Sequence, residues 1–329
     1  ICKRRKTNKT WPRLPSRDGS TGMRSPQQSP SETNLRRLEE NPGGRKQPSQ
    51  KLKLESARQH LIELWLFAVA PEICNLACTH CLYTASPKRR NRYRLTRNGL
   101  DSLMEQVKTL GASPHFLFTG GEPTLHPEIF DLLEATERSG FIFQIMTNGS
   151  RINGKTAERL AQMSRLAKVQ VSLESADART ADSIRGKGIY RRILKSLDHL
   201  RERGIATTLA VSIMASNEGT LPKIKKLAAR KGADLKTISL YDLGAAKENG
   251  LKTTRLDGNG NGNTAPDLMC EKGVAYSEEA FYPCPILVKE QSAKLGDSLE
   301  QALSPEARRR LGRLREDHPA CQVCLRGST

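Results

Sequence analysis

Residues 61–81 read LIELWLFAVAPEICNLACTHC, an almost continuous apolar run followed at once by three cysteines. The run at 61–70 is typical of a strand buried on both faces of a parallel sheet. Cys74, Cys78 and Cys81 follow it with the spacing Cys-x3-Cys-x2-Cys, in a stretch short enough for three thiolates to converge on one metal centre. We therefore expect a metal-binding loop after the first strand.

The number of thiolates in this loop bears on the metal that it binds. Structural zinc closes its shell with four ligands, whereas three cysteines on a four-iron cubane leave one iron open for a substrate or cofactor. The spacing of the cysteines does not by itself decide between a zinc site and an iron–sulfur cluster. The alternatives are a zinc site that takes His80 as its fourth ligand and a set of buried structural thiols.

Strand and helix patterns alternate from this loop to Leu243. Between the strands, apolar residues at helical spacing are followed by glycines such as Gly111 and Gly232, which are placed to end helices. Short glycine-capped connections between alternating strands and helices predict a parallel α/β architecture. Periodicity leaves open whether the six units form a doubly wound sheet or an incomplete barrel. We also expect a helix that opens at Pro127, a helix that carries Leu160, Met163 and Leu166, and a hairpin between Cys270 and Cys284. The predicted strands span residues 61–70, 115–119, 141–147, 168–173, 206–214 and 234–240.

Small and polar residues follow the ends of the later predicted strands. Paired glycines let a ligand approach the backbone closely, a carboxylate can bind a cationic amine, and serine or glutamate can bond sugar hydroxyls. Because parallel α/β folds bind ligands at the carboxyl ends of their strands, we expect these residues to share one site. They are Gly120, Gly121, Glu122, Asn148, Ser172 and Glu174.

The cysteine spacing, the GGEP sequence at 120–123 and the strand order in which they occur resemble the radical S-adenosylmethionine (SAM) superfamily over residues 61–243. The resemblance implies an incomplete (β/α)6 TIM-like barrel and a catalytic [4Fe–4S] cluster held by Cys74, Cys78 and Cys81. The open iron would chelate the amino and carboxylate groups of SAM. Reductive cleavage of SAM would then give a 5′-deoxyadenosyl radical that abstracts hydrogen from a substrate.

The resemblance also implies roles for residues around the methionine and adenine parts of SAM. Gly120, Gly121 and Glu122 would hold the methionine amino group. Asn148 would line the same pocket. His80 stands where the family usually has an aromatic residue against the adenine, and an imidazole can stack there in a similar way.

Three further residues are assigned to SAM in the same way. Ser172 and Glu174 would contact its ribose or its carboxylate end. Arg185, in the run DSIRG at 182–186, resembles a family arginine that pairs with the SAM carboxylate. The alternative for Arg185 is a solvated side chain ahead of a helix.

Four more cysteines lie near the C-terminal end of the sequence. Cys270 and Cys284, the run LGDSL at 295–299, and the pair Cys321 and Cys324 resemble the SPASM/twitch modules that carry auxiliary iron–sulfur clusters. The resemblance implies one auxiliary [4Fe–4S] cluster. Full SPASM modules have about seven cysteines, so four indicate a single-cluster variant or a shortened copy. A zinc ribbon is the structural alternative.

Composition sets the remaining limits. Of the net charge of +19, a surplus of ten comes from residues 1–60, which hold 15 Lys and Arg against five Asp and Glu and few apolar residues, as in a disordered extension. The longest apolar run, 64–70, is too short to cross a bilayer, no secretory signal begins the sequence, and eight cysteines suit a reducing compartment. We therefore expect a cytoplasmic protein without a membrane partner. The predicted parts are a basic extension (1–60), the radical SAM core (61–243), a flexible Gly/Asn-rich linker (244–266) and the auxiliary-cluster module (267–329).

Maturation of peptides is the commonest task in the group that the sequence resembles. We therefore expect a radical SAM enzyme that modifies a peptide or protein and takes electrons from a donor such as flavodoxin or ferredoxin. The first alternative is cofactor or tetrapyrrole biosynthesis. RNA modification is disfavoured because over half of the surplus charge lies in residues 1–60. A zinc-stabilised nucleic-acid-binding protein without catalysis would leave the GGEP run unexplained.

Overall fold

Six parallel strands run in sequential order through one sheet. In the computed structural model, which describes residues 61–252 and 268–327 and side chains as far as Cys324, the strand order is β6–β5–β4–β3–β2–β1–β7–β8. A doubly wound sheet would reverse its strand order, so the order found here confirms the incomplete (β/α)6 barrel. The first six strands are β1 (Glu63–Phe67), β2 (His115–Thr119), β3 (Phe143–Thr147), β4 (Leu166–Ser172), β5 (Thr207–Ile213) and β6 (Asp234–Ser239).

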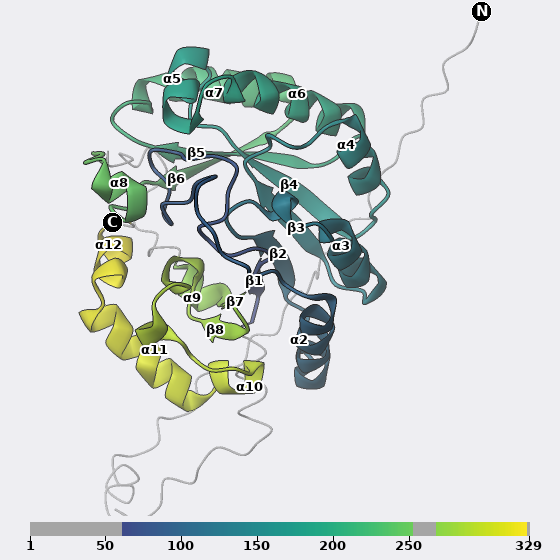
Figure 1. The fold of residues 1–329 in the computed structure, drawn as a ribbon, viewed down its shortest axis with the longest axis vertical. Helices are drawn as coiled ribbons and strands as arrows, with labels where there is room; N and C mark the ends of the chain where they lie inside the picture. Colours follow the sequence, from purple (N-terminus) through teal and green to yellow (C-terminus); the bar gives the residue numbers. More distant parts are fainter. Residues whose placement is uncertain (1–60, 253–267, 328–329) are drawn as a thin grey trace, which may run out of the picture. The chain divides into compact units, whose positions relative to one another are not determined.

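The helices between these strands lie along the outside of the curved sheet (Figure 1). Each right-handed strand–helix–strand crossover in a sequentially ordered sheet places its helix on the same face. The opposite face and the carboxyl ends of the strands therefore remain free to form a site. The helices are α2 (Arg97–Leu110), α3 (Ile129–Arg138), α4 (Gly154–Ala161), α5 (Ala178–Arg185), α6 (Ile189–Glu202) and α7 (Leu221–Lys231).

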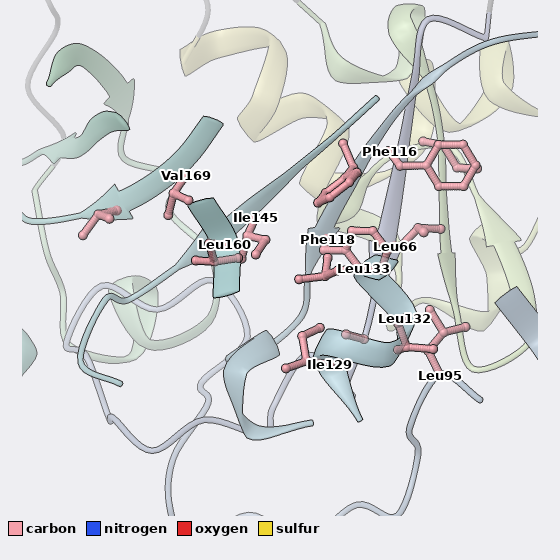
Figure 2. Close-up of a cluster of buried hydrophobic side chains, with 14 of the residues drawn as sticks. Leu66, Leu95, Phe116, Phe118, Ile129, Leu132, Leu133, Ile145, Leu160 and Val169 are labelled. Atoms are coloured by element: carbon pink, nitrogen blue, oxygen red, sulfur yellow. The ribbon is translucent and has the colours of Figure 1, made fainter. Parts of the chain in front are cut away.

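Apolar side chains from the strands and the outer helices form the main core. Figure 2 shows Phe116 and Phe118 of β2 together with Leu132 of α3, all of which are fully buried. Strand β5 is buried at six of its seven positions, as expected for a parallel strand covered on both faces. Such burial explains why unbroken apolar runs marked the strands in the sequence.

Some element boundaries differ from the predicted ones. Leu166, predicted to lie on a helix with Leu160 and Met163, is instead the first residue of β4, because α4 ends at Ala161. The helix predicted to open at Pro127 begins at Ile129 as α3, after a short 3-10 turn, η2 (Pro123–Leu125). The predicted helix ends at Gly111 and Gly232 are confirmed: both glycines adopt the left-handed conformation, with φ of 66°.

The C-terminal segment extends the same sheet. Strand β7 (Gly273–Ser277) pairs in parallel with β1, and β8 (Ala280–Tyr282) pairs antiparallel with β7, which is the hairpin predicted between Cys270 and Cys284. Gly273 is needed at this join, because a Cβ there would lie 1.7 Å from the carbonyl oxygen of Glu63. The C-terminal module is therefore continuous with the barrel sheet. Its helices are α9 (Met269–Lys272), α10 (Leu299–Ala302), α11 (Pro305–Asp317) and α12 (Pro319–Gly327), with η4 (Pro285–Leu287) and η5 (Gln291–Ala293) between them.

The first residues of the predicted linker form a helix, α8 (Gly244–Glu248), that packs on the cysteine loop. The Ala245 amide donates to the Cys81 carbonyl at 2.9 Å, and the Asn249 side chain donates to the Thr79 carbonyl at 2.9 Å. The predicted extension (1–60) and residues 253–266 of the predicted linker lie outside the described residues. Among the described residues, no helix is both long and apolar enough to span a membrane.

Candidate radical SAM active site

The three predicted cluster ligands line one cavity at the carboxyl ends of the strands. Cys74, Cys78 and Cys81 lie in the loop between β1 and α2, and all three border a cavity of about 280 Å³. The Cys81 amide donates to the Cys78 carbonyl at 3.1 Å, which turns the loop so that both side chains reach the cavity. The structure therefore brings the three thiols together, as the spacing predicted.

Each of the three sulfur atoms accepts a hydrogen bond from a nearby N–H group. The Leu76 amide donates to Cys74 Sγ at 3.4 Å, and the Ala85 amide donates to Cys81 Sγ at 3.4 Å. The Nη1 atom of Arg185 lies 3.8 Å from Cys78 Sγ. Hydrogen bonds of this kind orient thiolate ligands and set the potential of an iron–sulfur centre.

The chemistry of this donor set fits a [4Fe–4S] cluster. Burial raises the pKa of the Cys74 thiol to about 11 and that of the Cys78 thiol to about 12. These thiols would lose their protons on binding a metal, which would stabilise the thiolates. Within residues 61–252 and 268–324, no three His, Cys, Asp or Glu side chains converge closely enough to hold a single metal ion. The three thiols border one shared cavity.

The predicted glycines fit closely against the loop that carries the cysteines. A Cβ on Gly121 would lie 1.9 Å from the Ile73 carbonyl oxygen, and a Cβ on Gly120 would lie 2.6 Å from the Val69 carbonyl oxygen. Both glycines also line the cavity. Their lack of side chains thus lets the end of β2 pack against the cysteine loop and leaves backbone exposed to a ligand.

Glu122 is the residue that is predicted to bind the SAM amine. Its side chain is fully buried and is absent from the cavity wall. One carboxylate oxygen accepts from the hydroxyls of Thr124 (2.6 Å) and Thr147 (2.7 Å), and the other accepts from the Asn148 amide (2.7 Å). Glu122 therefore ties the end of β2 to the end of β3, and binding an amine would require it to exchange one of these partners.

Asn148 lines the cavity beside Cys74. Its Nδ2 atom lies 3.5 Å from Cys74 Sγ and donates to Asn75 Oδ1 at 3.0 Å. Its Oδ1 atom accepts from the Ser150 amide at 2.9 Å, which fixes the orientation of the amide group. Asn148 thus holds the start of the cysteine loop against the end of β3.

Glu174 and Arg185 form a buried ion pair next to the cysteines. Arg185 Nη2 donates to Glu174 Oε1 at 2.6 Å, and Arg185 Nε donates to the other oxygen of the same carboxylate. His80 Nε2 lies 3.3 Å from Glu174 Oε1. Burial opposes ionisation of Glu174, but the Arg185 guanidinium and His80 outweigh it and lower the pKa of this carboxyl to about 2. Arg185 is therefore not the solvated side chain of the alternative interpretation.

Of the remaining residues that are predicted to bind SAM, some line the cavity and one lies behind its wall. Ser172, His80 and Arg185 line the cavity, whereas Glu174 lies behind them and is 1% exposed. The Nδ1 atom of His80 is buried and has no hydrogen-bond partner among the described residues. A bound ligand with a donor or acceptor would satisfy it.

Replacing Arg185 with leucine is expected to destabilise the fold by about 3–5 kcal/mol, because Glu174 would keep a buried and uncompensated charge. Anaerobic urea unfolding at pH 7 measures this loss. The double variant Glu174→Leu/Arg185→Leu removes both charges and should recover most of it. Equal loss in the single and double variants would contradict a role for the pair in compensating buried charge.

Several cavity residues were not singled out in the sequence. Gln170 of β4 is 4% exposed and Ser212 lies on β5, while Tyr241 follows β6. The alternation of side chains along a strand could have indicated Gln170 and Ser172 as two residues on one face. Residues contributed by β5 and β6 carried no motif, and only the closing curve of the sheet brings them to the cavity.

The four C-terminal cysteines line a second cavity, which supports their assignment to one site. Cys270, Cys284, Cys321 and Cys324 border it together with apolar residues from the β7–β8 hairpin, η4, α11 and α12. Arg315 Nη2 donates to Cys270 Sγ at 3.1 Å. Burial raises the pKa of the Cys321 thiol to about 11 and also raises that of Cys284. Four thiols in an apolar wall fit the predicted auxiliary cluster.

Tyr83 connects the two cysteine groups. It lies two residues after Cys81 and lines the first cavity, and its hydroxyl donates to the carbonyl of Pro285, the residue after Cys284, at 2.8 Å. Burial is the main cause that raises its pKa well above the usual range, and the Cys284 and Cys81 thiols add to the effect. No motif in the sequence indicated this contact, since it joins residues 202 positions apart.

Comparison with known proteins agrees with this geometry. Residues 69–228 match the family model of the radical SAM superfamily. This range contains the three cluster cysteines, both glycines of the GGEP run and Arg185. The chain therefore contains a radical SAM domain, and the predicted superfamily is confirmed.

The relatives with curated functions include a mycofactocin maturase and a pre-heme d1 synthase. The mycofactocin maturase MftC of Mycobacterium ulcerans is 32% identical over 172 residues, which are 52% of this chain and 46% of the relative. The pre-heme d1 synthase of Dinoroseobacter shibae is 31% identical over 162 residues, which are 49% of this chain and 39% of the relative. The matches thus span less than half of these relatives.

Among solved structures, Streptococcus suis SuiB bound to S-adenosylmethionine resembles the chain with a TM-score of 0.59 and 16% sequence identity. The superposition covers 83% of this chain and 70% of SuiB. At this identity the likeness shows a shared fold, which includes the α/β core that the sequence predicted.

Proposed function

We propose that this chain is a radical SAM enzyme that abstracts hydrogen from a peptide or protein substrate. The observation that carries the proposal is the single cavity that Cys74, Cys78 and Cys81 share with the polar residues at the strand ends. When bound, a [4Fe–4S] cluster and SAM would together supply reductive cleavage of SAM and a radical able to abstract hydrogen. The thiol ligands suit a reducing compartment, and we place the enzyme in the cytoplasm.

The residues of the chain would prepare this reaction in distinct ways. Cys74, Cys78 and Cys81 would hold the cluster, and the N–H groups directed at their sulfurs would stabilise the thiolates. Gly120 and Gly121 would offer backbone to the methionine part of SAM. The strand ends and the cysteine loop together line the cavity in which these groups would bind.

Further residues around the cavity would complete the SAM site. Ser172 and His80 line its wall, where they can bind the ribose and adenine. The Glu174–Arg185 pair would hold His80 and Cys78 in position, since Glu174 contacts the imidazole and Arg185 contacts the sulfur. Asn148 would support Cys74.

A peptide substrate is supported by two relatives and by the second cysteine group. MftC is a maturase, and SuiB has been crystallised with its precursor peptide SuiA. An auxiliary cluster held by Cys270, Cys284, Cys321 and Cys324 would accept the electron that remains on an oxidised product. Tetrapyrrole chemistry is the second candidate, because the pre-heme d1 synthase matches at 31% identity over 49% of the chain.

The test uses the full chain, purified and reconstituted without oxygen. With SAM and dithionite it is expected to form 5′-deoxyadenosine, and its electron paramagnetic resonance spectrum is expected to change when SAM is added. Deuterated peptides encoded beside the gene, and iron coproporphyrin III as the tetrapyrrole probe, then identify the substrate class by deuterium transfer into 5′-deoxyadenosine. Colourless protein with stoichiometric zinc would refute the proposal.

A further inference from the structure

A third cavity borders the predicted cluster ligand Cys74. It measures about 310 Å³ and is lined by residues 73–75 of the cysteine loop, by Leu125 and by residues of the segment 86–94, which we call the basic loop. Cys74 also lines the first cavity, so it forms part of both walls. A molecule that occupies the third cavity would therefore lie beside Cys74 without entering the SAM site.

The basic loop carries an unusual concentration of positive charge. Its sequence, SPKRRNRYR, has five Lys and Arg and no Asp or Glu. Lys88, Arg89, Arg90 and Arg92 are exposed. Within residues 61–252 and 268–324, none of these four side chains forms an ion pair with an acidic group. The charge is therefore available to a partner.

The loop is also fixed to the cysteine loop by several contacts. Bridges between the backbones of Val69 and Arg94 and of Ile73 and Ser86 join the two segments. Asn91 Nδ2 donates to the carboxylate of Glu72 at 2.8 Å. Glu72 lies on the cysteine loop, two residues before Cys74. This anchoring holds the charges in a defined arrangement and lowers the entropic cost of binding.

Asn91 also anchors the basic loop to the C-terminal hairpin. The same Nδ2 atom donates to the carboxylate of Glu278 at 2.9 Å. Glu278 and Glu279 form the β7–β8 turn and both have positive φ, of 50° and 60°. Non-glycine residues adopt this conformation at a cost, and the contact with Asn91 helps to hold the turn in place. The basic loop is thus supported on two sides.

We propose that the basic loop is the docking surface for an acidic one-electron carrier protein. The inference rests on the proposed function, because the chemistry of the first cavity requires an electron from outside. One electron would leave the docked carrier, which is oxidised, and pass to the centre that Cys74 helps to hold, which is reduced. Complementary charge suits transient redox complexes, whose interfaces are small and whose association is steered by electrostatics.

The other partners that a basic surface can bind fit these observations less well. Nucleic acid binding would favour exposed aromatic residues between the charges, but the one aromatic side chain of the loop, Tyr93, is half-buried with its hydroxyl enclosed. An acidic substrate would have to reach the first cavity, where Ser212 and Tyr241 line the wall. Neither residue borders the third cavity. An electron donor would explain the proximity of the basic loop to Cys74.

The test compares two reductants on the reconstituted full chain. A triple variant, Arg89→Glu/Arg90→Glu/Arg92→Glu, reverses the charge of the loop without touching a residue assigned to the SAM site. A matched triple variant, Lys223→Glu/Lys225→Glu/Lys226→Glu, makes the same change of charge at exposed positions of α7. SAM cleavage is measured with dithionite, and separately with an acidic recombinant flavodoxin kept reduced by its reductase. Binding of oxidised flavodoxin is measured at 50 and 300 mM salt.

With the loop variant, flavodoxin-driven cleavage is expected to fall at least about tenfold and flavodoxin binding to weaken, because the steering charge is reversed. Dithionite-driven cleavage should stay within about twofold of wild type. The α7 variant should match wild type in all three measurements. For wild type, binding should weaken at the higher salt.

Three results would overturn the proposal. The first is unchanged flavodoxin binding in the loop variant. The second is an equal fall of flavodoxin-driven and dithionite-driven cleavage in the loop variant. The third is flavodoxin binding that is weakened equally by the α7 variant. If wild type cleaves no SAM with dithionite, the proposed function fails. The binding measurement still decides the docking surface in that case.

Discussion

A Cys78→Ala variant is expected to form no detectable 5′-deoxyadenosine from SAM. Cys78 is one of three thiols around the first cavity, and Arg185 is directed at its sulfur. Two remaining thiolates would leave a second iron without a protein ligand, so the centre would no longer hold one differentiated iron. Iron content is expected to fall by roughly four atoms per chain. The measurement pairs iron analysis with chromatography of 5′-deoxyadenosine after reaction with dithionite.

Two controls separate loss of the ligand from loss of the fold. Thr79→Ala changes the neighbouring residue of the same loop and should keep both iron and SAM cleavage. Cys78→Ser preserves the size of the side chain, so its thermal unfolding should match wild type without iron while cleavage is still lost. If 5′-deoxyadenosine forms at the wild-type rate in Cys78→Ala, the assignment of the three cysteines is wrong.

The order of the strands was accessible from the sequence because burial on both faces leaves an unbroken apolar run. Strand β2 was predicted at residues 115–119 and lies at His115–Thr119. Leu166 was misplaced because an apolar residue at helical spacing also fits the start of a buried strand. The pairing of β7 with β1 had no local signal, since it joins residues more than 200 positions apart.

The functional residues also differ in how far the sequence alone could predict their roles. The cysteines could be predicted because ligands on one short loop must lie close together, whatever the rest of the fold does. The carboxylates could not be assigned so simply. Glu122 and Glu174 are buried, and a buried carboxylate must be satisfied by whichever donors the fold brings to it. Here these are Thr147, the last residue of β3, and Arg185, the last residue of α5.

The relation between the two cysteine groups is also a property of the fold. The residues after Cys81 continue towards the C-terminal module, where Leu82 packs with the apolar group around Cys284. Tyr83 lines the first cavity and bonds to the carbonyl of Pro285. The two sites are thus joined through a short buried connection. A change at one cysteine site can therefore affect the reaction at the other site, even though the cysteines of that other site are still present.

A Cys284→Ala variant is expected to separate the two functions. Cys284 is 8% exposed and lines the second cavity, and the residues that line this cavity include neither Cys74 nor Cys78. Its loss should remove roughly four iron atoms per chain, if the four cysteines hold one [4Fe–4S] cluster. SAM cleavage in the absence of substrate should stay within about threefold of wild type, because the first cavity keeps its three ligands. Conversion of the substrate should be lost, because the product electron would have no acceptor.

The comparison requires that the two measurements are made on the same preparation. Iron and sulfide are counted after anaerobic reconstitution, and 5′-deoxyadenosine and modified substrate are then quantified from a single reaction. A Cys2→Ala variant, which removes a cysteine of the predicted N-terminal extension, serves as the matched control and should retain all of the iron. Unchanged iron in Cys284→Ala would mean that the second cavity holds no cluster. Loss of SAM cleavage together with the iron would mean that the connection through Tyr83 makes the first site depend on the second for its structure.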